Sequence, residues 1–443
     1  MNTTDKLGRA PGQPLSPQAR PGARAWFVLA TLCFVYVLNF LDRQLLSILA
    51  KPIQDELGVS DGELGLITGL YFAIFYCVVG IPVAWLADRT NRVRVLAIAC
   101  GIWSAATLAC GLAKTYPQLV VARITVGIGE AGGVPPSYAI ISDYFPPGRR
   151  GAALALFNFG PPLGMALGVA LGASLAEAFS WRSAFMTLGV IGIFAAVFVA
   201  VFVKEPKQGG LDAPLPAAMD AAEMQTGFWA TVKMFFTRPV LLLVSMACGA
   251  IQFVTYATLN FTTLFLMREK GMSLSELAIY YSLLLGIGVS AGMYASGWLV
   301  DRFGARSKTA YAIVPAIGLT AAIPFFLGFV WAPGWPLALL FLIGPTFFNY
   351  FYLSPSVALV QEAVRPNQRV MAGALLLLVM NLIGLGLGPT YLGAMSDFLR
   401  PDYPNNSLQI AFYTLTPFYL LAAGLFVLLA RALKREASEH AGV

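Results

Sequence analysis

The chain has 443 residues, of which 58% are hydrophobic and only 12% are charged, and its mean hydropathy is +0.72. A soluble domain carries about twice that share of charged residues, so the composition excludes an ordinary soluble enzyme or binding domain. The net charge of +7 does not indicate nucleic-acid binding, because the basic residues gather in short segments between apolar runs.

Twelve apolar runs are each long enough to cross a ~30 Å hydrocarbon core as a helix. We therefore expect an all-α polytopic membrane protein. The expected helices lie near 25–50, 64–87, 94–113, 117–143, 151–176, 182–203, 238–267, 275–299, 309–330, 335–360, 370–396 and 407–431.

The helices divide into an N-terminal six-helix half, 25–203, and a C-terminal half, 238–431, joined by a polar linker at 204–237. The end of this linker is expected to lie on the membrane as an amphipathic helix. Residues 1–24 are predicted to be a disordered tail without a signal peptide, and 432–443 a second tail.

Basic residues predict the orientation. Most of the 29 Lys and Arg lie in the tails and in the loops that follow even-numbered helices. By the positive-inside rule these segments are cytoplasmic. We expect a multi-pass protein of the cell (inner) membrane with both termini in the cytoplasm.

A short polar motif occurs once in each half. The first copy supplies Asp88, Arg89 and Arg92, and the second supplies Asp301, Arg302 and Arg306. Such charges could serve only as topology signals, but topology requires no acid, and the acid is repeated. We interpret both clusters as a cytoplasmic gate between two pseudo-symmetric halves, the arrangement expected of a transporter that rocks around a central site.

Four charges lie within otherwise apolar helices of the first half: Asp42 and Arg43 in the first helix, Arg123 and Glu130 in the fourth. A charge at bilayer depth is costly unless it is paired or wetted, so such residues usually face a cavity. Arg123, Gly127 and Glu130 share one helical face. We interpret the four charges, called the tetrad below, as a proton-coupling and substrate site; the alternative is a structural ion-pair lock between the two helices.

Proton coupling would use the acids of the tetrad. The single histidine, His440, lies in the C-terminal tail, so no expected membrane helix contains an imidazole. Burial favours the neutral form of a carboxylic acid and a nearby guanidinium favours the charged form, so moving the arginine switches the acid. We expect protons as the coupling ion and no other cofactor.

The second half supplies the other wall of the expected cavity, and its helices carry no charge near the middle. The expected lining consists of Tyr256, Asn260, Phe347, Asn349 and Tyr350, with Asn39 from the first half. A cavity charged on one side and apolar-aromatic on the other suits an amphipathic solute of the lysophospholipid or sphingoid type. It also suits a small organic or aromatic acid anion imported with protons.

Several sequence segments resemble a known family. The polar motif of both halves resembles the signature of the major facilitator superfamily, over residues 25–431. The first half resembles its spinster branch, whose animal members are tied to sphingolipid and lysolipid export. The matching segments are 39–43, 60–66, 87–92, 123–131 and 141–145. The resemblance implies the major facilitator fold and coupling or substrate roles for Asp42, Arg43 and Glu130. It also implies that the repeated Asp pairs across the halves when the cytoplasmic side is closed.

Two other motifs have a packing interpretation. The glycines at 127, 129 and 132 match a dinucleotide fingerprint but lie within a membrane helix. Ser290 lies in a nucleophile-elbow pattern, yet no membrane helix offers a His base. We therefore expect no enzyme, no metal and no nucleic-acid partner. We expect a monomer whose partners are membrane lipids and an amphipathic small molecule.

Overall fold

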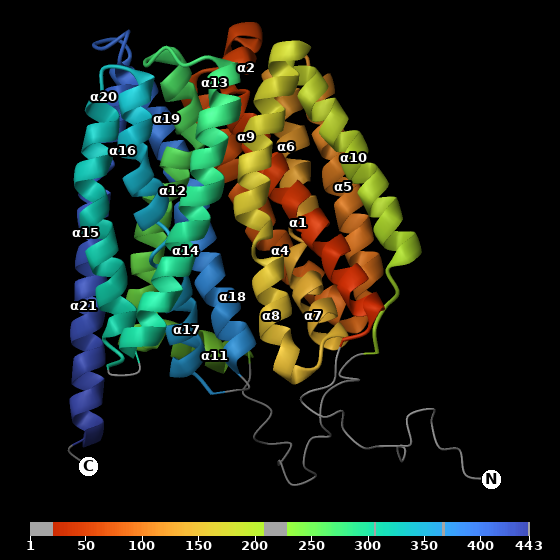
Figure 1. Cartoon of the computed structure of the whole chain (residues 1–443), viewed down its shortest axis with the longest axis vertical. Helices are drawn as coiled ribbons and strands as arrows, with labels where there is room; N and C mark the ends of the chain where they lie inside the picture. Colours follow the sequence, from red (N-terminus) through yellow and green to blue (C-terminus); the bar gives the residue numbers. More distant parts are fainter. Residues whose placement is uncertain (1–20, 208–227, 305–306, 366–367, 442–443) are drawn as a thin grey trace.

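The computed structural model describes residues 21–207, 228–304, 307–365 and 368–441. Within these ranges the regular structure is helical throughout. The helices stand side by side in two bundles, and the chain passes from the first bundle to the second between α10 and α11 (Figure 1).

The first half contains α1 (Ala23–Ile48), α2 (Ala50–Leu57), α3 (Asp61–Thr68), α4 (Leu70–Arg89), α5 (Arg92–Leu112), α6 (Tyr116–Glu130), α7 (Val134–Tyr144), α8 (Pro147–Phe157), α9 (Gly160–Ala178) and α10 (Trp181–Phe202). The second half contains α11 (Phe228–Thr237), α12 (Pro239–Arg268), α13 (Leu274–Glu276), the π-helix η1 (Leu277–Tyr281), α14 (Ser282–Gly304), α15 (Ala310–Trp331), α16 (Trp335–Phe348), α17 (Leu353–Ala363), α18 (Arg369–Met380), the π-helix η3 (Asn381–Leu387), α19 (Gly388–Leu399), α20 (Ser407–Tyr413) and α21 (Thr416–Ala441).

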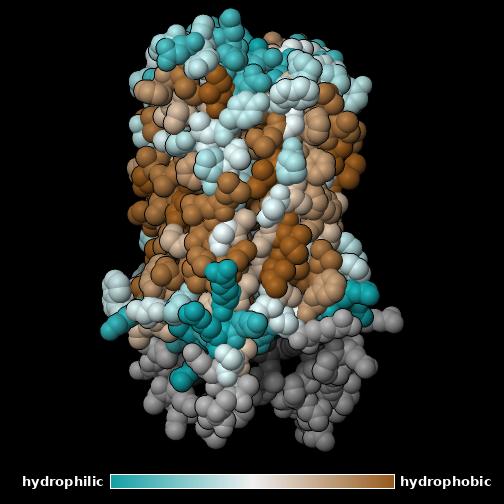
Figure 2. Space-filling model, turned by 90° about the vertical axis from the view of Figure 1, so that its left-hand side faces the viewer, coloured by the Kyte–Doolittle hydropathy of each residue, from teal (hydrophilic) through white to brown (hydrophobic). Residues whose placement is uncertain are grey.

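Eleven segments of the described chain are long and apolar enough to cross a membrane. The broken segment α6–α7 is a twelfth crossing, because α1 begins and α21 ends at the same end of the bundle (Figure 1). The predicted twelve-helix architecture is confirmed in outline. The molecular surface agrees: the side on which α15 and α21 lie is brown through its middle and teal above and below (Figure 2).

Helix interruptions occur at matching places in the two halves. The fourth span breaks between α6 and α7 and the tenth between α16 and α17, while the fifth breaks between α8 and α9 and the eleventh contains η3. Proline explains several of these breaks, since α7, α9 and α19 each begin with one at the first or second position. The repeat that the sequence predicts is thus also present in the backbone.

The two halves pack against each other at one end of the bundle. We call the end where α1 begins and α21 ends the termini end, and the opposite end the far end (Figure 1). Towards the far end, α3 packs on α19, α4 on η3, and α9 on α13, η1 and α14. At the termini end, the main packing partners of α7, α8, α17 and α18 all belong to their own halves.

The predicted linker and tails fall partly outside the described residues. Residues 1–20, 208–227 and 442–443 are not described. The end of the linker forms α11, as expected, with Phe235 buried and Trp229 exposed. The C-terminal tail continues α21 as a helix to Ala441 rather than ending it at 431.

Glycines in the two misleading motifs serve helix packing. A side chain at Gly129 would collide with Trp103 of α5, and one at Gly132 with Ala99 of the same helix. On α14, Gly292 lies against the backbone of Phe347. Small residues of this kind allow helix backbones to approach closely in membranes, so the packing interpretation of both motifs is supported.

Candidate functional site

The tetrad forms two ion pairs between α1 and α6. The Nε of Arg43 lies 2.6 Å from an oxygen of Glu130, and Nη1 of Arg123 lies 3.5 Å from an oxygen of Asp42. The side chains of Glu130, Arg123 and Asp42 are 0%, 3% and 5% exposed, and that of Arg43 is 13% exposed. Four charges deep inside the first half are therefore neutralised pairwise, and Arg43 is the member most open to the outside of the cluster.

Aromatic rings enclose the Arg43 guanidinium. Its central carbon lies 5.0 Å from the ring centre of Phe40, 5.1 Å from that of Phe72 and 4.9 Å from that of Tyr76. The central carbon of the Arg123 guanidinium lies 5.6 Å from the ring centre of Phe72. Because a cation is attracted to the face of an aromatic ring, these rings favour the charged guanidinium in a place with little water.

Gly127 brings the Phe72 ring to the charges. A side chain at Gly127 would press against the backbone oxygen of Phe72, so the glycine allows α4 to lie directly on α6. Gly127 on the charged face of α6 therefore serves the packing of a neighbouring helix. Close packing of α4 then places the Phe72 ring within reach of both arginines.

Several polar atoms of the tetrad have no hydrogen-bond partner in the described part of the chain. They are both carboxylate oxygens of Asp42, one oxygen of Glu130, and Nε and Nη1 of Arg123. A buried polar atom left unsatisfied costs about 1–3 kcal/mol. In a purely structural ion-pair lock, these atoms would be expected to have hydrogen-bond partners. The atoms without a partner therefore favour a site that takes water, protons or a solute.

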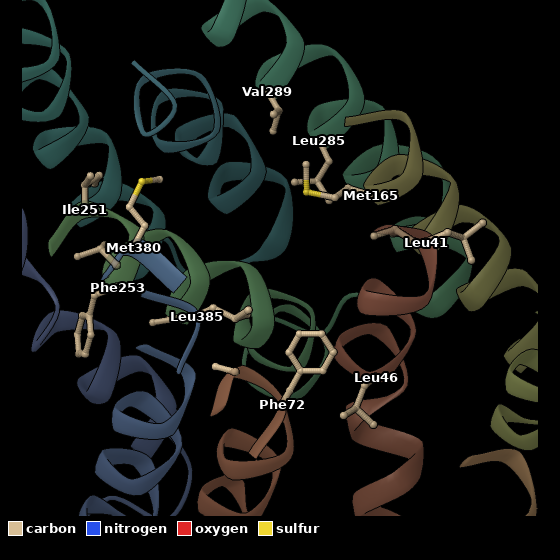
Figure 3. Close-up of a cluster of buried hydrophobic side chains, with 14 of the residues drawn as sticks. Leu41, Leu46, Phe72, Met165, Ile251, Phe253, Leu285, Val289, Met380 and Leu385 are labelled. Atoms are coloured by element: carbon tan, nitrogen blue, oxygen red, sulfur yellow. The ribbon is translucent and has the colours of Figure 1, made fainter. Parts of the chain in front are cut away.

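A cavity lies between the halves beside the tetrad. Its charged lining is Arg43 and Arg123, whereas the two acids lie behind them. The remaining lining residues are Phe40, Gln44, Thr68, Phe72, Met165, Tyr256, Leu259, Asn260 and Leu385. Met165 of α9 and Leu285 of α14 meet across the interface, and Leu385 faces Phe72 (Figure 3).

The expected lining residues divide into three groups. Tyr256 and Asn260 line the central cavity. Asn349 and Tyr350 line a second, neighbouring void within the second half. Asn39 is buried on α1, and Phe347 meets the Phe348 ring edge-on and the Phe351 ring at a tilt; neither belongs to the lining of these two spaces.

A cluster at the far end was missed by the sequence analysis. Asp61, the first residue of α3, is fully buried and receives two 2.8 Å hydrogen bonds from the Arg268 guanidinium of α12. Ser396 and Gln54 donate to the same carboxylate, each at 2.6 Å. Arg400 lies 3.4 Å away. We call this cluster the far-end latch, because it joins the first half to α12 and α19 of the second.

Backbone contacts extend the far-end latch. The Asp397 carboxylate accepts hydrogen bonds from the backbone N–H groups of Asp61 and Gly62, at 3.1 and 2.8 Å, and so caps α3 from the other half. Side chains at Gly62 or Gly65 would collide with Asp397 or with the backbone at Pro389. The latch lies on the far-end side of the cavity, since α3 runs from Asp61 to the cavity residue Thr68.

A buried acid lies next to the latch. Glu269 follows Arg268, lies 3.7 Å from it, and accepts hydrogen bonds from the backbone N–H groups of Leu408 and Gln409, at 2.9 Å each. Burial raises the pKa of Glu269 above its ordinary value, against the lowering effect of these hydrogen bonds and of Arg268. This acid thus fixes the start of α20 beside the latch.

Sequence signals for the latch are weak. Ser60 and Glu63 form a capping box around Asp61, and Ser273 and Glu276 form the matching box in the second half. This repeated box marks the start of both second spans. It does not reveal the partners of Asp61, because Arg268 looks like an ordinary basic residue of a loop.

The proposed gate residues lie apart at the termini end. Arg92 pairs with Asp143 of α7 at 2.7 Å and with Glu205, just after α10, at 2.8 Å, so neither partner belongs to the second half. Arg89 lies over the ring of Trp85 at 4.3 Å, and Arg302 over the ring of Trp298 at 5.5 Å. Asp301 is exposed. Arg306 and the side chain of Asp88 are outside the described part, so a gate across the halves stays a prediction.

The arrangement of the two halves around the cavity is typical of one group of membrane proteins. Two pseudo-symmetric helical halves enclose a charged central cavity and meet at one end, which is the architecture of a membrane transporter with alternating access. The family model of the Major Facilitator Superfamily matches residues 32–389, which is most of the chain. The chain belongs to this superfamily of transporters.

Individual relatives agree with this assignment. An MFS-type efflux pump of Mycolicibacterium smegmatis is 34% identical, covering 92% of this chain and 93% of its own. A hexuronate transporter of Bacillus subtilis is 28% identical, covering 84% and 87%. A crystal structure of a bacterial homologue of the human lysosomal transporter spinster, inward-facing and unoccupied, superimposes with a TM-score of 0.85 at 28% identity, covering 94% and 99%. The predicted resemblance to the spinster branch is confirmed.

Removing the charge of Asp61 is expected to open the far end. Breaking a buried ion pair by changing one partner costs about 3–5 kcal/mol, and in Asp61→Asn this penalty falls on the closed state. Pulsed spin-label distances between exposed Lys114 and Asp402 should lengthen. Asp55→Asn, which removes an exposed acid paired with Lys51, is the matched control and should leave the distances unchanged. Identical distance distributions in Asp61→Asn and the wild type would remove the latch role.

Removing the repeated motif acids is expected to destabilise closure of the termini end. Asp88→Ala and Asp301→Ala should shift label distances at that end towards the separated arrangement described here. Asp402→Ala, an exposed acid at the far end, is the control. If neither single variant changes the distribution, the two acids are topology signals rather than a gate.

Proposed function

We propose that this protein is a proton-coupled secondary active transporter of an amphipathic solute with an anionic head, of the lysophospholipid or sphingoid phosphate type. We further propose that it works in the cell (inner) membrane with the termini end in the cytoplasm. The observation that carries the proposal is the tetrad: two buried ion pairs whose arginines line the central cavity while their acids lie behind.

Protonation and anion binding are linked through Arg43. With Glu130 ionised, the guanidinium is held by the carboxylate at 2.6 Å. A proton on Glu130 removes that charge and leaves Arg43 as an unpaired cation at the cavity wall, where an anionic head can replace the carboxylate. Arg43 cannot pair fully with the Glu130 carboxylate and with the anionic head of the solute at the same time. The proton and the anion therefore bind together, and their gradients set the direction of flux.

The same linkage gives a route to alternating access. In the arrangement described here the far end is closed by Asp61 and Arg268, and the halves pack weakly at the termini end. If the termini end is cytoplasmic, this arrangement is inward-facing. Filling the cavity draws together α1 and α6 of one half and α12 of the other, which favours closure at the termini end at the expense of the far-end latch.

The body of the solute would meet apolar groups. Phe40, Phe72, Met165, Leu259 and Leu385 surround the arginines in the central cavity. A solute with only a polar head would make no contact with these apolar groups. A hydrocarbon alone would exclude water from the charged groups without offering them hydrogen bonds. This balance supports an amphipathic solute.

A small organic acid anion is the second candidate. The relative from Bacillus subtilis is a hexuronate transporter, and the second half of this chain carries a group of buried threonines beside the cavity. Arg43 and Arg123 would then clamp a carboxylate. For this candidate, protonation of Glu130 and anion binding at Arg43 remain linked as above, and only the body of the solute differs.

Changing Glu130 tests the coupling. Glu130→Gln preserves the size of the side chain but cannot release a proton, so pH-driven accumulation in proteoliposomes should be abolished while the protein remains monodisperse. Asp55→Asn should behave as wild type, because that acid is exposed. Full pH-driven uptake by both Glu130→Gln and Asp42→Asn would contradict the assignment of these acids.

Ligand-dependent thermal stability tests the solute class. A ligand at 100 times its Kd stabilises the folded state by about 2.7 kcal/mol. A lysophospholipid below its micellar concentration should therefore raise Tm more than a hexuronate or a short dicarboxylate does. Arg123→Ala should weaken the shift for all chain lengths, and Tyr256→Leu should change the preferred chain length. A shift by hexuronates or small aromatic acids, with none by lysolipids, would favour the organic-acid candidate.

A further inference from the structure

A second void lies beside the central cavity, within the second half. It is enclosed by α12, η1, α14 and α16. Leu259 lines both spaces, so they are neighbours across one residue of α12. The buried polar lining consists of Thr255, Thr258, Thr262, Tyr281, Thr346 and Asn349, the half-buried Tyr350 adds a further hydroxyl, and no charged residue lines the void.

Three of the threonines are satisfied by their own helices. Thr255 donates to the carbonyl of Ile251 at 2.9 Å, and Thr262 donates to the carbonyl of Thr258 at 2.7 Å. Thr346 donates in the same way to Leu342, at 2.5 Å. Since each hydroxyl proton is already used, these groups can offer a guest only their oxygen lone pairs.

Two groups are not satisfied in this way. The hydroxyl of Thr258 has no hydrogen-bond partner in the described chain, although the residue is only 6% exposed. Asn349 accepts a 2.9 Å hydrogen bond from the hydroxyl of Tyr419 through its oxygen. Its amide N–H groups make no hydrogen bond within the described residues. The void therefore presents both donors and acceptors.

Ordinary helix packing does not explain this pattern. Back-bonding to the preceding turn is common for threonine in membrane helices, and it accounts for Thr255, Thr262 and Thr346. It leaves Thr258, whose unsatisfied hydroxyl is unfavourable next to an apolar neighbour. Valine has nearly the same shape and would fill the position without this penalty, so the hydroxyl needs another reason.

We propose that this void is a hydroxyl-recognition subsite, in which Thr258 and Asn349 bind a neutral hydroxyl group of the transported solute. The inference rests on the proposed function and deepens it: the anionic group lies at Arg43 and Arg123, and a hydroxyl near it reaches the second half. A hydroxyl both donates and accepts, as the void requires, whereas a carboxylate or phosphate would find no cation there.

The void adds polar groups to the lining expected from the second half. That lining already included Asn349, and the void places buried threonines beside it, with no charged residue. A solute with a bare hydrocarbon directly after its anionic group would leave Thr258 and Asn349 unsatisfied. The specificity we infer is for an anion with a hydroxyl close to the charge, a feature shared by lysophospholipid heads and sugar acids.

Paired probes test the subsite on the purified full-length protein in detergent. The lipid pair is a 1-acyl-glycerol 3-phosphate and its 2-deoxy analogue; the sugar pair is a hexuronate and a six-membered cyclic ether carboxylate without hydroxyls. Titrations give a Kd for each probe. In the wild type, the hydroxylated member of at least one pair should bind about tenfold more tightly than its partner, as expected for one good buried hydrogen bond.

Variants of one threonine identify the group responsible. Thr258→Val should reduce the tenfold preference to about one while leaving the Kd of the deoxy probe unchanged, and Thr258→Ser should retain the preference. Thr320→Val is the matched control, because that hydroxyl back-bonds to Ala316 on α15, away from both cavities. If Thr258→Val does not give a monodisperse protein, Thr258→Ala replaces it.

The outcomes separate the subsite from the function. Equal binding of both members of each pair by the wild type overturns the subsite and leaves the proposed function intact. The same holds if Thr258→Val keeps the preference. No binding by any of the four probes overturns the proposed function together with the subsite. The pair that binds also distinguishes a lipid-like solute from a sugar acid.

Discussion

The pairing of four buried charges between α1 and α6 is the constraint on which the rest of the first half depends. An isolated charge in a low-dielectric interior is strongly unfavourable, so each member must have a partner within a few ångströms. Arg43 with Glu130, and Arg123 with Asp42, meet this need only when α1 and α6 keep one register. Gly127 and the Phe72 ring fit around the same pairs. The pairs are costly for stability alone, which is consistent with a site that changes its charge during work.

The interruptions of the helices lie where such a change could be transmitted. Glu130 is the last residue of α6, directly before the break to α7, and Asn349 is the first residue after α16 in the corresponding break of the second half. The π-helix η3 includes the cavity residue Leu385. Backbone at such places is less regularly hydrogen-bonded than in a continuous helix, and π-segments are frequent at functional sites. The breaks thus lie beside residues of the tetrad and of the two voids.

The helices α3, η3 and α19 connect the far-end latch with the cavity. Asp61 satisfies its carboxylate with donors from both halves, and glycine contacts place the backbones of α3 and α19 against each other. This interface is polar, buried and closely packed, and it joins the two halves at the far end. The termini end has no comparable interface in the described residues. Such asymmetry is what a transporter captured in one state of its cycle should present.

The twelve spans, the two halves and the residues of the tetrad can be predicted from the amino-acid sequence, because the cost of placing a charge or a polar backbone in hydrocarbon leaves a strong local signal. The sequence also indicated the repeat and the family. The folded structure is needed to show that Arg43 pairs with Glu130 and not with its neighbour Asp42. It is also needed to show that Arg268 pairs with Asp61 and that Thr258 lines a void. These features depend on helix rotation and on contacts between residues far apart in the chain. No periodicity or local composition records them.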